Sequence, residues 1–273
     1  MPELPEVETV CRGLKKSLKG RSFAKVDLYR KNLRIPFPAK LNESLKGRAV
    51  KDVARRAKYI LIELDDENTL IAHLGMSGRF TVNKKDYKLK KHDHAVITLD
   101  NENLLVFNDA RRFGLITLAP KKTIEKHTLI KNLGLEPLEN SFNGEALFKL
   151  FKGKKAPVKN VIIDQRLVVG VGNIYAAESL FMSGISPKRA ANKVVKNECE
   201  ILAQNIKKVL ENAIKAGGST FSDYRNSEGD AGYFQFNFQV YSRENLNCLK
   251  CKSKIQRLKQ AGRSTFYCPT CQK

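Results

Sequence analysis

The chain has 273 residues, of which 50 are Lys or Arg and 28 are Asp or Glu, so its formal net charge is +22. A hydrophobic share of 42% excludes a chain that is disordered by composition, and the length suffices for one or two domains with a small appendix. The charge predicts a polyanionic partner, nucleic acid before an anionic membrane. No apolar run approaches the ~20 residues of a membrane span, and no signal-peptide core follows Met1, so we expect a cytoplasmic protein.

The first six residues read Met1-Pro2-Glu3-Leu4-Pro5-Glu6. Removal of Met1 would give Pro2 a free secondary amine, whose pKa of about 7.7–8.0 leaves a fraction neutral and nucleophilic at pH 7. Glu3 and Glu6 beside it could move protons. The same residues also suit the first turn of a helix, where proline fits and carboxylates complement the helix dipole. On these residues alone, the helix-start interpretation is favoured over the catalytic one.

Apolar residues at positions 7, 10, 14 and 18 have helical spacing and predict an amphipathic helix directly after the N-terminus. From residue 22 to about residue 118 the chain predicts short strands separated by polar turns, which is typical of a sandwich or a barrel. The predicted strands are Phe23–Tyr29, Tyr59–Leu64, Leu70–Leu74, Phe80–Val82, Ala95–Leu99 and Leu104–Phe107.

After Pro120 the pattern becomes helical, and Gly217-Gly218 is a plausible helix stop before a polar segment. Further on, apolar residues alternate at positions 234, 236, 238 and 240, which predicts a half-buried strand. The organisation is therefore a β domain, a helical domain and a small C-terminal module. The predicted helices are Glu145–Phe151, Asn173–Ser183 and Cys199–Ala216.

The C-terminal module holds two Cys-x-x-Cys pairs, Cys248 with Cys251 and Cys268 with Cys271. This spacing predicts one structural zinc ion held by four thiolates, and a closed cysteine set leaves no position open for catalysis. The segment between the pairs is basic, which favours phosphate contact over a merely solvated hairpin. The other two cysteines, Cys11 and Cys199, fall on apolar helix faces and are expected in the core.

Both ends of the chain and five ordered internal motifs resemble the formamidopyrimidine-DNA glycosylase family. The resemblance covers the whole chain in the right order. It implies an α+β multi-domain fold: an N-terminal β-sandwich with a leading helix at 1–130, a helix–two-turn–helix domain at 131–235 and a C-terminal β-hairpin zinc finger at 236–273. The motifs are Met1–Val10, His73–Gly78, Lys91–His94, Asn108–Gly114, Gly170–Tyr175, Gly217–Thr220 and Gly262–Cys271.

The resemblance implies a bifunctional DNA glycosylase and AP lyase of base excision repair. Pro2 would attack C1′ of a damaged deoxynucleotide, expel the oxidised purine through a Schiff base and cleave the strand by β,δ-elimination. Glu3 would protonate the opening sugar and help remove the C2′ proton, and Glu6 would hold the site together. Lys58 matches an essential strand lysine, although strand-edge lysines are usually solvent-facing. Arg263 matches the zinc-finger arginine that grips phosphates around the flipped nucleotide.

Base excision takes the nucleotide out of the stack, and the vacated space must be filled. By resemblance Met76, Arg111 and Phe113 fill it: methionine is pliable, phenylalanine can wedge between bases, and arginine can hydrogen-bond the orphaned cytosine. Residues 219–233 correspond to the family's loop over the extruded base, and their composition suits a mobile lid. The remaining DNA-binding positions carried over by resemblance are His73, His92, Lys155, Lys159 and Asn173.

The expected partner is duplex DNA containing damaged bases or abasic sites, bound by a monomer. Two departures from the family pattern, Ser242 and the Gly262–Thr265 stretch, touch no catalytic position. Three alternatives stay open: the sister class that prefers oxidised pyrimidines, a non-catalytic zinc DNA-binding protein, and an N-terminal-proline tautomerase. Leu4, Lys58 and the intact void-filling set favour the purine interpretation. A DNA-binding protein has no need for the Pro2-Glu3 terminus, and the size, charge and cysteines argue against a tautomerase.

Overall fold

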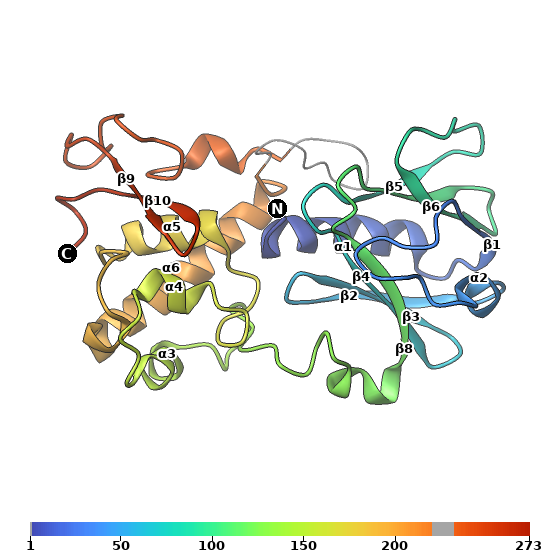
Figure 1. Cartoon of the computed structure of the whole chain (residues 1–273), viewed down its shortest axis with the longest axis horizontal. Helices are drawn as coiled ribbons and strands as arrows, with labels where there is room; N and C mark the ends of the chain where they lie inside the picture. The colour runs from blue at the N-terminus through green and yellow to red at the C-terminus, as the bar shows by residue number, and fades with distance from the viewer. Residues whose placement is uncertain (1, 220–231) are drawn as a thin grey trace. The chain divides into compact units, whose positions relative to one another are not determined.

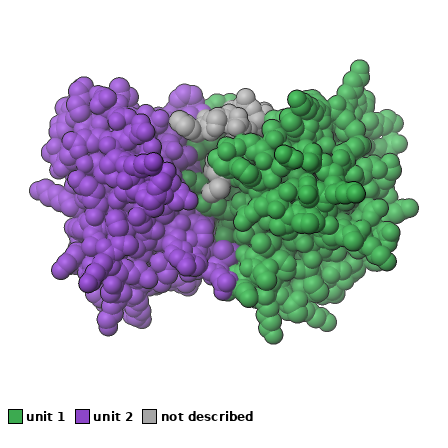
Figure 2. Space-filling view, viewed as in Figure 1, with its two compact units in different colours: residues 1–131, 216–233 green, residues 132–215, 234–273 purple. Residues whose placement is uncertain are grey.

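The computed structural model describes residues 2–219 and 232–273 (Figure 1). By internal contacts the chain forms two compact units, coloured separately in Figure 2: Met1–Lys131 with Ala216–Tyr233, and Asn132–Lys215 with Phe234–Lys273. The three-part division at 130 and 235 stays a prediction. Met1 and most of the predicted loop at 219–233 lie outside the described residues. No helix in the described ranges is both long enough and apolar enough to cross a membrane.

The first unit begins with helix α1, Leu4–Leu18, which confirms the helix predicted from apolar spacing. Pro5 lies in its first turn, where a missing N–H costs no hydrogen bond, and Lys15 and Lys16 lie in its last turn, where cations complement the helix dipole. The apolar stripe that predicted this helix is fully buried, at Val7, Val10, Leu14 and Leu18.

Two four-stranded antiparallel sheets follow, which confirms the predicted sandwich. One sheet has the order β1-β6-β7-β5 and the other β2-β3-β4-β8. The short helix α2, Leu41–Leu45, and a 3-10 helix, η1 (Lys121–Lys126), complete this unit. The strands are β1 Phe23–Leu28, β2 Val50–Arg56, β3 Tyr59–Leu64, β4 Asn68–His73, β5 Arg79–Asn83, β6 Asp93–Leu99, β7 Leu104–Asn108 and β8 Leu115–Pro120.

Strands β2 and β8 were not predicted, and for β2 a bulge explains why. Its pairing register with β3 shifts between Val50 and Asp52, so its buried valines, Val50 and Val53, are three residues apart instead of two. A bulge adds one residue to a strand and breaks the alternation on which a sequence prediction depends. The charged residues around the two valines conceal the strand further.

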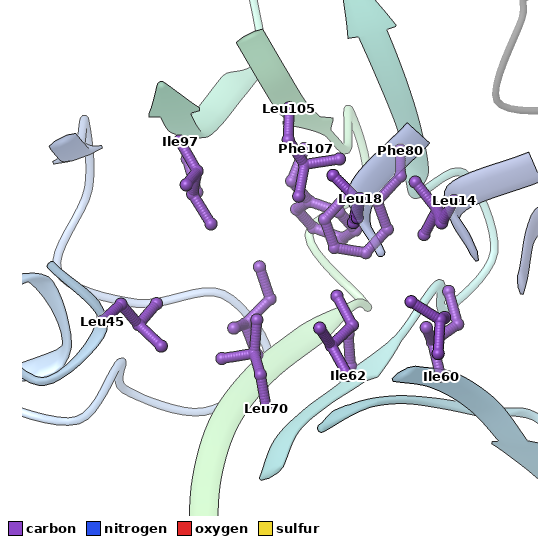
Figure 3. Close-up of a cluster of buried hydrophobic side chains, with 14 of the residues drawn as sticks. Leu14, Leu18, Leu45, Ile60, Ile62, Leu70, Phe80, Ile97, Leu105 and Phe107 are labelled. Carbon is purple, nitrogen blue, oxygen red and sulfur yellow. The ribbon is translucent and has the colours of Figure 1, made fainter. Parts of the chain in front are cut away.

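Side chains from both sheets and from α1 and α2 meet in one core, as Figure 3 shows. The two inner faces of the sandwich each contribute alternate residues of their strands, as face-to-face packing requires. Helix α1 covers part of this core with its apolar stripe. The labelled residues are Phe80, Ile97, Leu105 and Phe107 from one sheet, Ile60, Ile62 and Leu70 from the other, and Leu14, Leu18 and Leu45 from the helices.

The second unit contains four α-helices in its described residues, together with a two-stranded hairpin. The three predicted helices are confirmed within a few residues at each end, and the short helix α4 was not predicted. The elements are α3 Gly144–Phe151, α4 Val158–Ile162, α5 Asn173–Met182, η2 Ala191–Lys193, α6 Lys196–Lys215, η3 Phe234–Asn237, β9 Gln256–Gln260 and β10 Arg263–Tyr267.

The predicted half-buried strand at residues 234–240 is wrong, because this segment begins with the 3-10 helix η3. Phe234 and Phe238 are four residues apart and both buried, with their ring centroids at 6.0 Å, while Phe236 between them is 79% exposed. The spacing of the buried rings is therefore helical, and the apparent alternation came from the exposed Phe236.

The backbone that follows η3 is held by a carboxylate. Glu178 of α5 is 2% exposed, and its two oxygens accept hydrogen bonds from the backbone N–H groups of Gln239, Val240 and Tyr241 at 2.8–3.1 Å. A buried carboxylate requires such donors, and buried N–H groups require an acceptor. Glu178 therefore fixes the chain where it enters the C-terminal module.

Replacing Glu178 tests this assignment. We expect Glu178→Ala to lower the free energy of unfolding by about 3 kcal/mol, because one buried and two partly buried N–H groups lose their acceptor. Glu178→Gln keeps one oxygen and should lose about half of that amount. Urea unfolding followed by circular dichroism measures both, and equal stability of Glu178→Ala and the unmodified protein would contradict the role.

Candidate functional site

The carboxylate of Glu6 anchors the N-terminal residues of the first unit. It is 2% exposed, and its Oε2 accepts a hydrogen bond from the backbone N–H of Glu3 at 2.8 Å. Its Oε1 accepts from the backbone N–H and the hydroxyl of Ser219, at 2.8 and 3.1 Å. Pro2 and Glu3 are themselves buried. Glu6 thus holds the segment that carries the predicted nucleophile against a residue 213 positions away.

Lys58 lies in the two-residue turn between β2 and β3, and not within a strand as its match to a strand lysine predicted. It is 6% exposed, so the alternative of a solvent-facing strand-edge lysine is wrong. The turn is held by Arg55, which donates to the carbonyl oxygen of Ala57 at 2.9 Å and to Glu8 of α1 at 3.0 Å. Arg55 therefore ties the Lys58 turn to α1, the helix that follows Pro2 and Glu3.

His73, at the end of β4, is neutral in this setting. Burial, together with the nearby charges of Lys58 and Arg34, lowers its pKa from 6.5 to about 4. Its Nδ1 accepts from the backbone N–H of Gly75 at 2.9 Å, so the proton of the neutral ring is on Nε2, which can donate a hydrogen bond. Arg34 is an exposed cation that the sequence analysis did not single out. The site thus contains three basic side chains: the buried Lys58, the neutral His73 and the exposed Arg34.

Met76 and Phe113 lie on two turns that pack backbone to backbone, and both side chains are exposed, by 37% and 47%. The contact occurs at Gly75, whose φ is +64°, and a Cβ built there would lie 2.4 Å from the carbonyl carbon of Phe113. Only glycine satisfies both conditions. Arg111 is also exposed, and its guanidinium lies 5.1 Å from the centre of the Phe113 ring. The three predicted void-filling residues are therefore brought together.

Asp109 holds these two turns, and the sequence analysis did not predict its role. It is completely buried, and its carboxylate accepts from the Ser77 hydroxyl at 2.6 Å and from the backbone N–H of Gly114 at 2.8 Å. The Ser77 oxygen in turn accepts from the backbone N–H of Arg111 at 3.0 Å. An aspartate two residues before a pair of arginines was the only available signal in the sequence.

His92 and His94 join the same turn to strand β6. The backbone carbonyl of His92 accepts from the backbone N–H of Asp109 at 3.0 Å, and Nε2 of His94 lies 2.8 Å from the carbonyl oxygen of Asp109. Burial lowers the pKa of His94, which is 4% exposed. His92 is half-buried. His92, the predicted phosphate ligand, is thus close in the fold to the void-filling residues.

The second unit brings together three of the predicted DNA-binding residues. Asn173 opens α5, Lys159 lies in α4 and Arg263 begins β10. The Lys159 ammonium donates to the Asn173 side-chain oxygen at 2.5 Å, and the Asn173 amide donates to the carbonyl oxygen of Ser264 at 2.9 Å. Arg263 is exposed, whereas Lys159 is only 1% exposed. Lys155, four residues earlier, is exposed at the surface.

The four cysteines of the C-terminal module form one metal site. Their sulfur atoms all lie within 4.8 Å of one another, with Cys248 and Cys271 at 3.9 Å and Cys251 and Cys268 at 3.4 Å. A tetrahedral zinc with Zn–S bonds of ~2.3 Å separates its sulfur ligands by about 3.8 Å. These residues therefore fit one structural zinc ion. Cys11 and Cys199, by contrast, are buried in the core as predicted.

The metal module is fastened to the helical part of its unit by its last residues. Gln272 accepts from the backbone N–H of Cys268 and donates to the carbonyl oxygen of Ile185, both at 2.9 Å. The backbone N–H of Lys273 donates to the carbonyl of Gly184 at 2.9 Å. The module is thus held by hydrogen bonds on one side and by the expected metal on the other.

Asp109 offers a test of how the two turns are held. We expect Asp109→Asn to lower the free energy of unfolding by about 1–2 kcal/mol, because an amide has one acceptor oxygen for two donors. The Gly114 amide should exchange its hydrogen faster, which NMR measures. Asp86→Asn, at an exposed position of the same unit, is the control and should change neither quantity. Unchanged exchange at Gly114 in Asp109→Asn would contradict the role.

The metal site is tested by Cys248→Ser, which removes one of the four thiolates. We expect zinc content well below one ion per chain and local unfolding of the β9–β10 hairpin, because a module of this size depends on its metal. Elemental analysis and hydrogen exchange measure the two effects. Leu249→Ala, at a 51% exposed neighbour, should retain full zinc. Full zinc in Cys248→Ser would exclude this residue as a ligand.

Comparisons with known proteins agree over the whole chain. Three family models match: the formamidopyrimidine-DNA glycosylase N-terminal domain at residues 1–116, the H2TH domain of the same glycosylase at 133–225, and a zinc finger found in FPG and IleRS at 246–273. A formamidopyrimidine-DNA glycosylase from Ruegeria sp. (strain TM1040) is 46% identical over 283 residues, covering 100% of both chains. One from Rickettsia felis is also 46% identical, covering 100% of this chain and 98% of the relative.

Solved structures agree as well. A Lactococcus lactis FPG mutant in complex with DNA that contains Fapy-dG has a TM-score of 0.93 at 32% identity, and 100% of both chains is covered. The Lactococcus lactis Fpg in complex with DNA that contains an abasic site has a TM-score of 0.92 at 32% identity, and 99% of both chains is covered. With the fold, the cysteine site and these full-length matches in agreement, the chain belongs to the formamidopyrimidine-DNA glycosylase family.

Proposed function

We propose that this protein is a bifunctional DNA glycosylase and AP lyase that excises oxidised purines, such as 8-oxoguanine and formamidopyrimidines, from duplex DNA. The observation that carries the proposal is the Glu6 carboxylate, which holds Glu3 and Ser219 in one buried arrangement at the start of α1. A capping box accounts for the Glu3 contact, but a helix start does not require the second Glu6 oxygen to bind Ser219, 213 positions away. Family membership and the relatives bound to lesion-containing DNA support the same conclusion.

In the proposed reaction, removal of Met1 frees the secondary amine of Pro2. Its lone pair forms a bond to C1′ of the damaged nucleotide, and the bond from C1′ to the base nitrogen breaks, so the base leaves with that electron pair and takes up a proton. Opening of the sugar gives an iminium ion between Pro2 and C1′. Loss of a C2′ proton then expels the 3′-phosphate, and a second elimination expels the 5′-phosphate.

Side chains near the nucleophile carry out the acid–base steps. Glu3 protonates the ring oxygen as the sugar opens and then helps to remove the C2′ proton. Glu6 accepts three hydrogen bonds and therefore acts by holding Glu3, not by moving protons itself. Lys58 assists base loss and elimination from its buried turn. Neutral His73 contributes an Nε2–H donor for a phosphate oxygen.

Binding is assigned to exposed and half-buried groups of both units. Met76, Arg111 and Phe113 fill the space left by the extruded nucleotide, and their shared support by Asp109 and Gly75 suits this task, because a wedge must be rigid to separate bases. Arg263, Asn173, Lys155 and His92 bind backbone phosphates, which fix the protein on the duplex without reading sequence. The zinc ion is structural, and the protein acts as a monomer.

The sister activity on oxidised pyrimidines is the second candidate. One Lactococcus lactis Fpg structure, at a TM-score of 0.91 and 32% identity, holds DNA that contains an oxidised pyrimidine. The two activities share the Pro2 chemistry and differ in which base is accepted. Single-turnover excision of 8-oxoguanine and of an oxidised pyrimidine, each opposite its normal partner, ranks them directly.

The nucleophile is tested by trapping. We expect the unmodified protein to form a covalent adduct when it is incubated with a duplex carrying 8-oxoguanine opposite cytosine and then treated with borohydride. One extra residue before Pro2 turns its amine into an amide, so adduct attributable to Pro2 should disappear. Binding to a duplex with an uncleavable abasic analogue should persist, because phosphate contacts elsewhere carry it.

Peptide mapping by mass spectrometry locates the attachment site, and Glu3→Gln is the control. Glu3→Gln keeps the free amine of Pro2 and should still bind DNA. It should lose turnover, because Glu3 carries out the proposed acid–base steps. An adduct on any residue other than Pro2 would overturn the mechanism. A protein that binds the duplex but never forms an adduct would instead be a non-catalytic zinc DNA-binding protein.

A further inference from the structure

The buried ammonium group of Lys159 suggests a different role for this residue than phosphate binding. Lys159 is 1% exposed, and its Nζ donates to the side-chain oxygen of Asn173 at 2.5 Å, to the hydroxyl of Thr265 at 2.6 Å and to the carbonyl oxygen of Ser264 at 3.3 Å. An ammonium has three N–H donors, and burying it is costly unless they are satisfied. A phosphate oxygen outside the protein therefore has no direct path to this group.

The three acceptors come from segments that are far apart in the chain. Lys159 is in α4, Asn173 opens α5, and Ser264 and Thr265 are in β10, about 105 positions away from Lys159. The Asn173 amide also donates to the carbonyl oxygen of Ser264 at 2.9 Å. Two side chains from the helices thus bind one backbone oxygen of the zinc module, which closes the network.

The exposed Arg263 stands next to this network. Side chains two residues apart on a strand point to the same face, so Arg263 lies at the rim of the face on which Thr265 is buried. Thr265 is completely buried, and its hydroxyl oxygen accepts a hydrogen bond from the Lys159 ammonium. The orientation of the Arg263 guanidinium relative to the Asn173 amide therefore depends on how β10 is attached to α4 and α5.

We propose that Lys159 and Thr265 are positioning residues that hold Asn173 and the Arg263 end of β10 as one phosphate-binding pair. The proposal rests on the function proposed above, in which Asn173 and Arg263 bind the DNA backbone. The buried Lys159 ammonium connects α4 to α5 through Asn173 and to β10 of the zinc module through Thr265. Neither the Lys159 nor the Thr265 side chain contacts DNA. Two phosphate ligands from different elements keep a fixed spacing only if the elements are locked together.

Thr265→Val is the sharpest test, because valine has nearly the same shape and lacks the acceptor oxygen. Thr265 is completely buried, so the change alters neither the surface nor the charge. We expect affinity for a duplex carrying an uncleavable abasic analogue to fall about ten-fold, the cost of one lost hydrogen bond to a charged group. The slope of log affinity against log salt should fall by about one, because Arg263 loses its phosphate contact.

Three further variants separate positioning from a general loss of structure. Thr265→Ser restores the hydroxyl and should recover affinity to within about two-fold. Lys159→Met should weaken binding at least as much as Thr265→Val. Combined with Asn173→Ala or Arg263→Ala, Lys159→Met should add much less than its separate effect, because residues in one network are not additive. Zinc content of each variant identifies any that has lost the module.

Affinity of Thr265→Val within two-fold of the unmodified protein, with its salt slope unchanged, would overturn the proposal. So would full additivity of Lys159→Met with Asn173→Ala and Arg263→Ala, which is the result expected if Lys159 binds a phosphate on its own. If Thr265→Val loses zinc, the additivity of Lys159→Met with Asn173→Ala and Arg263→Ala decides whether Lys159 is a positioning residue. Absence of a borohydride adduct with the unmodified protein would refute the proposed activity, while the binding measurements would still decide the positioning role.

Discussion

The carboxylate of Glu6 is the interaction on which the candidate active site depends. It accepts from the backbone of Glu3 on one side and from Ser219 on the other, 213 positions further along the chain. Without it, the first residues would be a short extended end, and such ends are poorly ordered unless they are tied down. A terminal amine can act as a nucleophile only if it is held at a fixed place, so the clamp that orders the terminus is also the precondition of the proposed chemistry.

The same device recurs at other places in the fold. Asp109, Lys159 and Glu178 are each at most 2% exposed, and each carries hydrogen bonds to at least two separate residues. A buried charge is costly unless every hydrogen-bonding position is satisfied, so it tolerates only one arrangement of its partners. The partners of Asp109 lie on the turns that carry the exposed Met76, Arg111 and Phe113, and Lys159 binds the strand that begins with the exposed Arg263. Glu178 binds the segment that leads into the zinc module. Buried charges therefore hold the segments on which the exposed residues of the proposed DNA-binding surface lie.

The zinc ion likewise holds the small C-terminal module together. Its hairpin of two short strands could not bury enough apolar surface to fold alone, and the four cysteines replace that missing core. Cys248 and Cys268 also pack with Phe181 of α5 and Val240, so the metal site continues into the apolar contacts of its unit. The segment that leads into the module is fixed by Glu178, and its last residues by Gln272. The metal thus stabilises a structure whose attachment is specified by ordinary hydrogen bonds.

The sequence by itself determined what local periodicity and fixed spacing encode: α1, most strands of the sandwich, the three longer helices and the four cysteines of the metal site. It did not reveal β8, nor β2, in which a bulge put Val50 and Val53 out of alternation. It misassigned η3, because Phe236 happened to be apolar and exposed. Arg55, Asp109 and Thr265 could not be recognised either, since their partners Glu8, Ser77 and Lys159 lie 47, 32 and 106 positions away. Only the tertiary structure decided which charges are buried and what they hold, because burial and pairing are properties of segments brought together by the whole fold and not of any one of them.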